Sequence, residues 1–217
     1  MRNRFDRELA NLNRELIEMG SLIEEAIDDA ISALLKKDVS RGEHAVNDNL
    51  VDEKEREIER HCLKLLLQQQ PVATDLRLIS TALKMIADME RIGDQAADIS
   101  EIAIYIAEHN TTFLNIDFTK MATATKKMVK DCIDAFVNKD IELAHDVIAY
   151  DDVVDELFNH IKYELINAVR TDGSLGEQVV DYLMVSKYFE RIGDHAVNVA
   201  EWVIFSLTGE HKNERII

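Results

Sequence analysis

Glu90-Arg91-Ile92-Gly93-Asp94 is the stretch that decides the fold, because the same five residues return in the same order as Glu190-Arg191-Ile192-Gly193-Asp194. The two copies begin 100 residues apart, at positions 90 and 190. Glu and Asp at i and i+4 project from one face of a helix, whereas a glycine inside a helix costs roughly 1 kcal/mol relative to alanine. The chain accepts that cost at both places, which indicates a structural requirement shared by two halves.

The composition favours long helices over strands and turns. The 217 residues include one proline and seven glycines, and 47% of them are apolar, which is ample for a core. We therefore expect an all-α protein. Because 42 Asp and Glu outnumber 25 Lys and Arg, the net charge is −17, which disfavours nucleic acid and anionic membranes as partners.

Cys62 and Cys132 lie among apolar residues and form neither a disulfide framework nor a metal-binding motif, so free buried thiols are expected. The N-terminal stretch turns acidic before any apolar region, unlike a signal peptide. No apolar run approaches the ~20 residues of a membrane span. These features predict a cytoplasmic protein that does not insert into a membrane.

Apolar residues recur at spacings of three and four along six segments, each of which we expect to be a helix. The predicted helices cover residues 5–35, 40–69, 74–109, 117–138, 140–170 and 176–207. Helices of this length span about 45 Å at 1.5 Å per residue, so each set of three should form an elongated antiparallel bundle. We expect the bundles to comprise residues 1–112 and 113–217.

The duplication extends beyond the pentapeptide. Lys37-Asp38-Val39 corresponds to Lys139-Asp140-Ile141, and Asp48-x-x-Val51-Asp52 corresponds to Asp151-x-x-Val154-Asp155. Between these landmarks the second copy is one residue longer. A repeat of about a hundred residues is too long for a solenoid unit and indicates a duplicated domain.

Acidic residues occupy core-facing positions of the predicted helices. Steps of alternately four and three residues along each helix trace the apolar stripe that faces the core. Glu90 and Glu190 lie within these stripes, and Asp94 and Asp194 follow one turn later. Asp98 continues the first row, and Asn198 replaces it in the second.

The preceding helix of each half supplies a second acidic pair. Asp151 lies in an apolar seam with Asp155 one turn further, whereas Asp48 and Asp52 lie beside their apolar stripe. We therefore expect inward placement more strongly for Asp151 than for Asp48 and Asp52.

Carboxylates that converge between helices must be compensated, because desolvating one alone costs several kcal/mol and neighbouring ones repel each other. The available cations are Arg91, Arg191 or a hard metal ion, which prefers oxygen ligands. Structural ion pairs with a facing helix, or a solvated acidic edge, are the alternatives to metal. A di-iron enzyme is a further alternative, although its usual Glu-x-x-His motif occurs once, at Glu142 to His145.

The doubled Glu-Arg-Ile-Gly-Asp, the preceding Asp-x-x-Val-Asp and Pro71-Val72-Ala73-Thr74-Asp75-Leu76-Arg77 closely resemble the PhoU family over essentially the whole chain. The resemblance implies a non-enzymatic regulator of bacterial phosphate-specific transport. It implies as partners the ATPase subunit of the phosphate ABC transporter and a sensor histidine kinase, whose phosphate-starvation response the regulator keeps off. A homodimer is a further possibility that the sequence leaves open.

The resemblance also implies multinuclear iron or zinc clusters, which some family members hold on acidic motifs. The candidate ligands carried over to this chain are Asp48, Asp52, Glu90, Asp94 and Asp98 in the first half and Asp151, Asp155, Glu190, Asp194 and Asn198 in the second. Asn198 offers a neutral amide oxygen, so we expect two sites of unequal charge.

Overall fold

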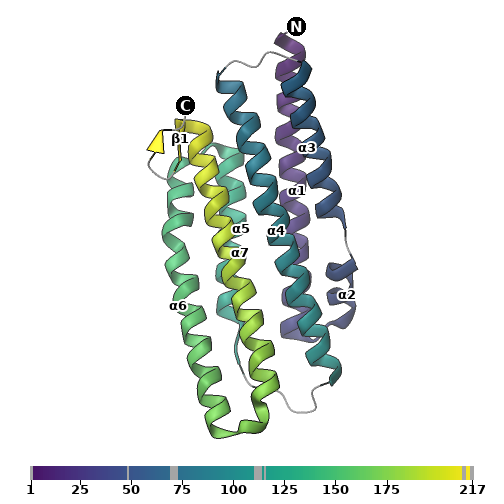
Figure 1. The fold of residues 1–217 in the computed structure, drawn as a ribbon, viewed down its shortest axis with the longest axis vertical. Helices are drawn as coiled ribbons and strands as arrows, with labels where there is room; N and C mark the ends of the chain where they lie inside the picture. Colours follow the sequence, from purple (N-terminus) through teal and green to yellow (C-terminus); the bar gives the residue numbers. More distant parts are fainter. Residues whose placement is uncertain are drawn as a thin grey trace.

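Two sets of long helices lie side by side in the computed structural model (Figure 1). The structure describes residues 2–47, 49–68, 73–109, 114, 116–211 and 214–215. The first set comprises α1 (Arg2–Lys36), α2 (Val39–Asn47), α3 (Leu50–Gln68) and α4 (Ala73–His109). The second set comprises α5 (Thr119–Asn138), α6 (Ile141–Thr171), the 3-10 turn η1 (Gly173–Leu175) and α7 (Gly176–Thr208), followed by a two-stranded ladder of β1 (Glu210–His211) and β2 (Glu214–Arg215). The all-α prediction is confirmed.

The helices form two layers. α3, α4, α7 and α6 lie next to one another in that order, while α1 packs on α3 and α4, and α5 packs on α7 and α6 (Figure 1). α4 and α7, which carry the two pentapeptides, run antiparallel against each other. The two halves are therefore related by an approximate two-fold axis between α4 and α7.

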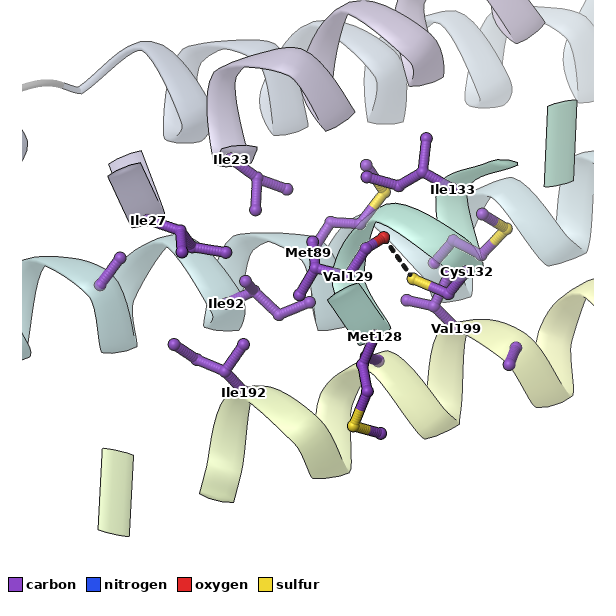
Figure 2. Packing of buried hydrophobic residues seen from close by; sticks show 14 of the residues in the cluster. Ile23, Ile27, Met89, Ile92, Met128, Val129, Cys132, Ile133, Ile192 and Val199 are labelled. Atoms are coloured by element: carbon purple, nitrogen blue, oxygen red, sulfur yellow. Dashed lines mark hydrogen bonds between the residues drawn. The ribbon is translucent and has the colours of Figure 1, made fainter. Parts of the chain in front are cut away.

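The isoleucine of each pentapeptide fills one core shared by both halves. Ile92 of α4 and Ile192 of α7 are 1% and 0% exposed, and they lie close together with Ile23 of α1 and Met128 of α5 (Figure 2). Cys132 is also buried here, and both cysteines are free, as the sequence predicts. Because the two halves bury these residues against each other, we expect neither half to have a complete core alone.

The helix predicted over residues 40–69 is divided, which corrects the sequence-based expectation. α2 ends at Asn47 and α3 begins at Leu50, whereas the corresponding part of the second half is the unbroken α6. The run Asn47-Asp48-Asn49 accounts for the break, because these short polar side chains compete with helical hydrogen bonding. Asn47 Nδ2 donates to the Glu43 carbonyl at 2.7 Å.

α2 is held against α1 by a buried carboxylate. Asp29 of α1 is 4% exposed and accepts a hydrogen bond from Arg41 Nη1 at 2.8 Å. Its other oxygen lies 2.7 Å from His44 Nδ1. These contacts fix the helix that leads into α3.

The other predicted helices match the observed ones to within about three residues. The duplicated Lys-Asp pair forms the same turn twice: Lys37 and Lys139 adopt positive φ angles of 58° and 54°. The aspartates that follow accept backbone N–H groups, Asp38 from Arg41 at 3.2 Å and Asp140 from Leu143 at 3.0 Å. The predicted boundary at residues 112 and 113 and the predicted helix end at residue 69 fall outside the described residues.

No helix in the described part of the chain is both long and apolar enough to cross a membrane.

Candidate metal centre

Three acidic side chains from two helices come together in the first half. Asp52 of α3 and Glu90 and Asp94 of α4 each offer an oxygen, and these oxygens all lie within 4.8 Å of one another. We call these residues the first acidic group. Asp52 converges with the others although the sequence pattern places it beside its apolar stripe.

The first acidic group is half-buried and crowded with negative charge. The side chains of Asp52, Glu90 and Asp94 are 41%, 20% and 40% exposed. Burial, followed by the charge of Asp94, raises the pKa of Glu90 above its ordinary value. Burial and the charges of Glu59 and Asp52 raise the pKa of the neighbouring Glu55 in the same way. Glu90 and Glu55 are therefore harder to ionise than free glutamates, and a nearby cation would favour their charged forms.

Two arginines lie at the edge of this group. Arg91 reaches Asp94 Oδ2 with Nη1 at 3.0 Å and Glu90 Oε2 with Nε at 3.4 Å, and Arg56 reaches Asp52 Oδ2 with Nη2 at 3.7 Å. Each arginine pairs with its own helix, and within the described residues no ion pair of this group joins α3 to α4. Arg91 forms no ion pair with α3 in the described structure, although its charge favours the ionised form of Glu55 on that helix.

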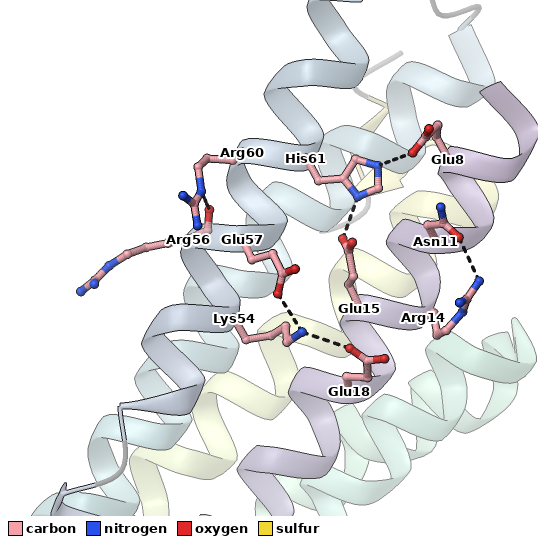
Figure 3. Close-up of polar contacts among 10 residues, drawn as sticks. All are labelled: Glu8, Asn11, Arg14, Glu15, Glu18, Lys54, Arg56, Glu57, Arg60 and His61. Carbon is pink, nitrogen blue, oxygen red and sulfur yellow. Dashed lines mark hydrogen bonds and ion pairs between the residues drawn. The ribbon is translucent and has the colours of Figure 1, made fainter. Parts of the chain in front are cut away.

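The position of α3, and hence of Asp52, depends on polar contacts with α1 (Figure 3). His61 of α3 lies between two carboxylates of α1, with Nδ1 2.7 Å from Glu15 Oε2 and Nε2 3.2 Å from Glu8 Oε2. Nearer the acidic group, Lys54 Nζ joins Glu18 Oε2 of α1 at 3.0 Å and Glu57 Oε2 of its own helix at 2.8 Å. The contacts of His61 with Glu8 and Glu15, and of Lys54 with Glu18, connect α3 to α1.

The second acidic group consists of Asp151 and Asp155 of α6 and Glu190 and Asp194 of α7. Asp151 is its most perturbed member, because burial and the charges of Asp194, Asp155 and Glu190 raise its pKa to about 6. Burial and Glu190 also raise the pKa of Asp194. Asp151 Oδ1 is buried and has no hydrogen-bond partner among the described residues. A buried oxygen of this kind is an acceptor without a donor, which a cation would satisfy.

The helix glycines of the pentapeptides allow the close approach that the sequence predicts. A Cβ atom on Gly193 would lie 3.2 Å from Asp151 Oδ1. In the first half, a Cβ atom on Gly93 would lie 3.1 Å from Val51 Cγ1. Both distances are tighter than ordinary packing, so the absent side chains let α3 approach α4 and α6 approach α7.

The second group also contains a cation that the sequence analysis missed. Lys187 forms an ion pair with Glu190, which is 14% exposed, and its ammonium lies over the Phe158 ring at 5.6 Å. The spacing of three residues between Lys187 and Glu190 on one helix is the sequence signal that could have predicted this ion pair. Among the described residues, the second group does not bring three ligand oxygens within 4.8 Å, unlike the first.

Asp98 and Asn198 occupy equivalent places between α4 and α7 rather than the centres of the acidic groups. Asn198 Nδ2 donates to Asp88 Oδ1 at 3.0 Å, and the same oxygen lies 2.9 Å from His195 Nδ1. On the other side of the two-fold axis, Asp98 is hydrogen-bonded to Tyr188. Metal ligation by Asp98 and Asn198 stays a prediction, as does ligation by Asp48, which lies outside the described residues.

The residues present fit an oxygen-ligated cation. The donors that converge are carboxylates, which Mg²⁺ and Mn²⁺ prefer and which Zn²⁺ and iron also accept. The close oxygens of the first group and the unpartnered Asp151 Oδ1 of the second both favour added positive charge.

The fold and these groups define a class of protein: an all-α molecule of two tandem helical repeats, each with an acidic group between its last two long helices. The sequence matches the PhoU domain over residues 16–103 and 118–203. The chain belongs to the PhoU family.

Several relatives match almost the whole chain. A phosphate-specific transport system accessory protein PhoU homolog of Clostridium acetobutylicum is 38% identical over 208 residues, covering 95% of both chains. A homolog of the same description from Thermotoga maritima is 33% identical and covers 97% of this chain and 91% of its own. The crystal structure of PhoU from Pseudomonas aeruginosa superposes with a TM-score of 0.90 at 33% identity, covering 95% of this chain and 100% of that one.

Proposed function

We propose that this protein is an accessory regulator of a phosphate-specific transport system and acts by binding other proteins. The observation that carries the proposal is the match to proteins described as such accessory proteins, which extends over both repeats. The phosphate transport system regulatory protein PhoU from Streptococcus pneumoniae, whose structure superposes with a TM-score of 0.88, supports the same role.

The finer parts of the proposal follow the family resemblance. The regulator binds the ATPase subunit of a phosphate ABC transporter and a sensor histidine kinase in the cytoplasm, and it represses the phosphate-starvation response without catalysing a reaction. Deletion of the gene should therefore leave alkaline phosphatase, or a reporter of that response, active in phosphate-rich medium. Repression that persists in the deletion strain would contradict this role.

The acidic groups are proposed to bind metal ions, iron or zinc by resemblance. Asp52, Glu90 and Asp94 would hold metal in the first repeat, and Asp151, Asp155, Glu190 and Asp194 would hold it in the second. A bound cation would neutralise the carboxylates and join the edge helix of each repeat to α4 or α7. This structural role needs no open coordination position.

Elemental analysis of protein purified without chelator tests the metal sites directly. We expect Glu90→Gln with Asp94→Asn to lose the metal of the first repeat and Glu190→Gln with Asp194→Asn that of the second. Glu101→Gln is the matched control, because Glu101 is an exposed carboxylate of α4. Absence of metal from wild-type protein after loading with iron, zinc, manganese or magnesium would favour the ion-paired, metal-free alternative.

A further inference from the structure

A cavity of about 390 Å³ lies between the two repeats, at the end of the molecule where α4 begins and α5 and α7 end. It is far along the helices from both acidic groups. Its lining comes from α1, α4, α5 and α7 and consists of Asn13, Ile17, Thr74, Asp75, Arg77, Leu78, Phe136, Val137, Lys139, Ser206 and Leu207. A volume of this size is within the range of pockets that hold small organic ligands.

Two buried polar atoms of the lining are unsatisfied. Arg77 Nε and Asn13 Oδ1 are inaccessible to solvent and have no hydrogen-bond partner among the described residues. A buried donor or acceptor left unpaired costs about 1–3 kcal/mol, so such atoms call for an explanation. Both atoms belong to residues that line the cavity, so the polar part of its wall is not fully satisfied by the protein itself.

The charges at the cavity favour an anion. Arg77 and Lys139 contribute two positive charges and Asp75 one negative charge. Within the described residues, neither cation forms an ion pair with a carboxylate. Neither positive charge is therefore neutralised by an ion pair at the cavity in the described part of the chain.

The rest of the wall is apolar. Phe136 is 9% exposed, and Val137, at 43%, lies where solvent reaches the lining. Ile17, Leu78 and Leu207 complete this side. An occupant would therefore need a hydrophobic body in addition to its charged group.

The corresponding place at the start of α7 is occupied by residues of the segment that connects the repeats. Gln178 stands in the second repeat where Leu78 stands in the first, and its Oε1 accepts the backbone N–H of Leu114 at 3.2 Å. Leu114 and Ile116, from the segment that connects the repeats, pack against the core there. In the described residues no connecting segment covers the cavity beside Leu78.

We propose that this cavity is a binding site for a small organic anion with a hydrophobic body. The anionic group binds Arg77, with Lys139 adding charge, and the body packs against Phe136 and Leu78. The site rests on neither the metal centres nor the proposed regulatory role. It also gives a function to Arg77, the last residue of the stretch at residues 71–77.

The probe 8-anilinonaphthalene-1-sulfonate has the required chemistry, and its uncharged analogue N-phenyl-1-naphthylamine has the same body without the sulfonate. Fluorescence titration of the full chain should show one sulfonate probe per chain. Arg77→Met should weaken its binding about tenfold, as expected for loss of one hydrogen bond to a charged group. The same substitution should leave binding of the uncharged analogue unchanged.

Two variants complete the test. Val137→Trp fills the cavity at an exposed position and should weaken binding of both probes, while the matched control Arg60→Met removes an exposed arginine of α3 and should change nothing. Circular dichroism checks that each variant is folded. If wild type and Val137→Trp bind the probes with equal affinity, the cavity is not the binding site. If Val137→Trp weakens binding of the sulfonate probe but Arg77→Met does not, the site does not select an anion.

Discussion

At the scale of single residues, Asp151 carries the clearest electrostatic cost. Its Oδ1 is buried without a partner in the described structure, and burial and four neighbouring carboxylates raise its pKa to about 6 from 3.8. A carboxyl whose pKa is higher in the folded state destabilises that state once it ionises. The cost is absent below the unfolded pKa, grows between about pH 4 and 6, and is complete above the folded pKa.

Asp151→Asn should therefore stabilise the metal-free protein at about pH 7.5 by about 1 kcal/mol, a value reduced for solvent screening. At about pH 4 it should have little effect, because the carboxyl is then protonated in both states. Urea unfolding in the presence of chelator measures the unfolding free energy of wild type and variant at both pH values. Asp146→Asn, at an exposed position of the same helix, is the control, and an equal gain at both pH values would contradict the assignment.

At the scale of elements, the two edge helices are positioned differently. α6 is continuous, whereas the corresponding part of the first repeat is divided into α2 and α3. α2 is fixed through Asp29, and α3 through His61 and Lys54, all by contacts with α1. Side-chain contacts with α1 therefore position the helix that supplies Asp52 to the first acidic group. The helix that supplies Asp151 and Asp155 to the second group is one continuous element.

His61→Ala should loosen α3 from α1, because it removes the only ring that joins Glu8 and Glu15 in the described structure. We expect a loss of about 2 kcal/mol in unfolding free energy and faster amide hydrogen exchange along α3. Arg60→Ala is the matched control, since the Arg60 Nε donates to the Arg56 carbonyl of its own helix at 3.0 Å. Unchanged exchange in His61→Ala would show that apolar packing alone holds the helix.

Asp29→Asn should weaken the attachment of α2 by about 2 kcal/mol, because the neutral amide loses the charge-assisted bond from Arg41 to the buried carboxylate. Chemical unfolding measures the loss. Glu43→Gln, on the exposed face of α2, should be neutral. A neutral Asp29→Asn would mean that Arg41 and His44 gain as much from solvent as from the buried carboxylate.

At the scale of the whole molecule, the two repeats behave as one body because they share a core. Ile92 and Ile192 pack together across the approximate two-fold axis, and the Asp88–Asn198 hydrogen bond crosses it as well. Unfolding one repeat would expose the apolar face of the other. A single cooperative transition is the expected consequence.

Ile92→Ala, in the first repeat, should destabilise the whole chain by about 2–4 kcal/mol. Trp202, the single tryptophan, lies on α7 of the second repeat, and the Lys84 ammonium of α4 lies over its ring at 5.9 Å, so it reports on α7 and on its contact with the first repeat. Its fluorescence and the helical circular dichroism should shift to the same lower urea midpoint. Val153→Ala, at a 37% exposed position, is the control, and separate midpoints for the two signals would contradict a shared core.

The sequence by itself determined the all-α class, the duplicated plan, most helix ends and the buried thiols. Periodicity and capping act within one or two helical turns, so a linear pattern suffices to predict them. The sequence also named acidic residues that the structure brings together, including Asp52, Glu90 and Asp94. The metal itself stays a prediction.

Only the tertiary structure decided which side chains meet across helices. The break between α2 and α3, the pairing of Lys187 with Glu190, and the contacts of Asp98 and Asn198 all depend on local competition or on the rotation and offset of neighbouring helices. The cavity beside Arg77 is likewise lined by residues from helices of both repeats, which only the packing of those helices brings together. Such offsets arise from packing between residues far apart in the chain, which helical periodicity does not encode.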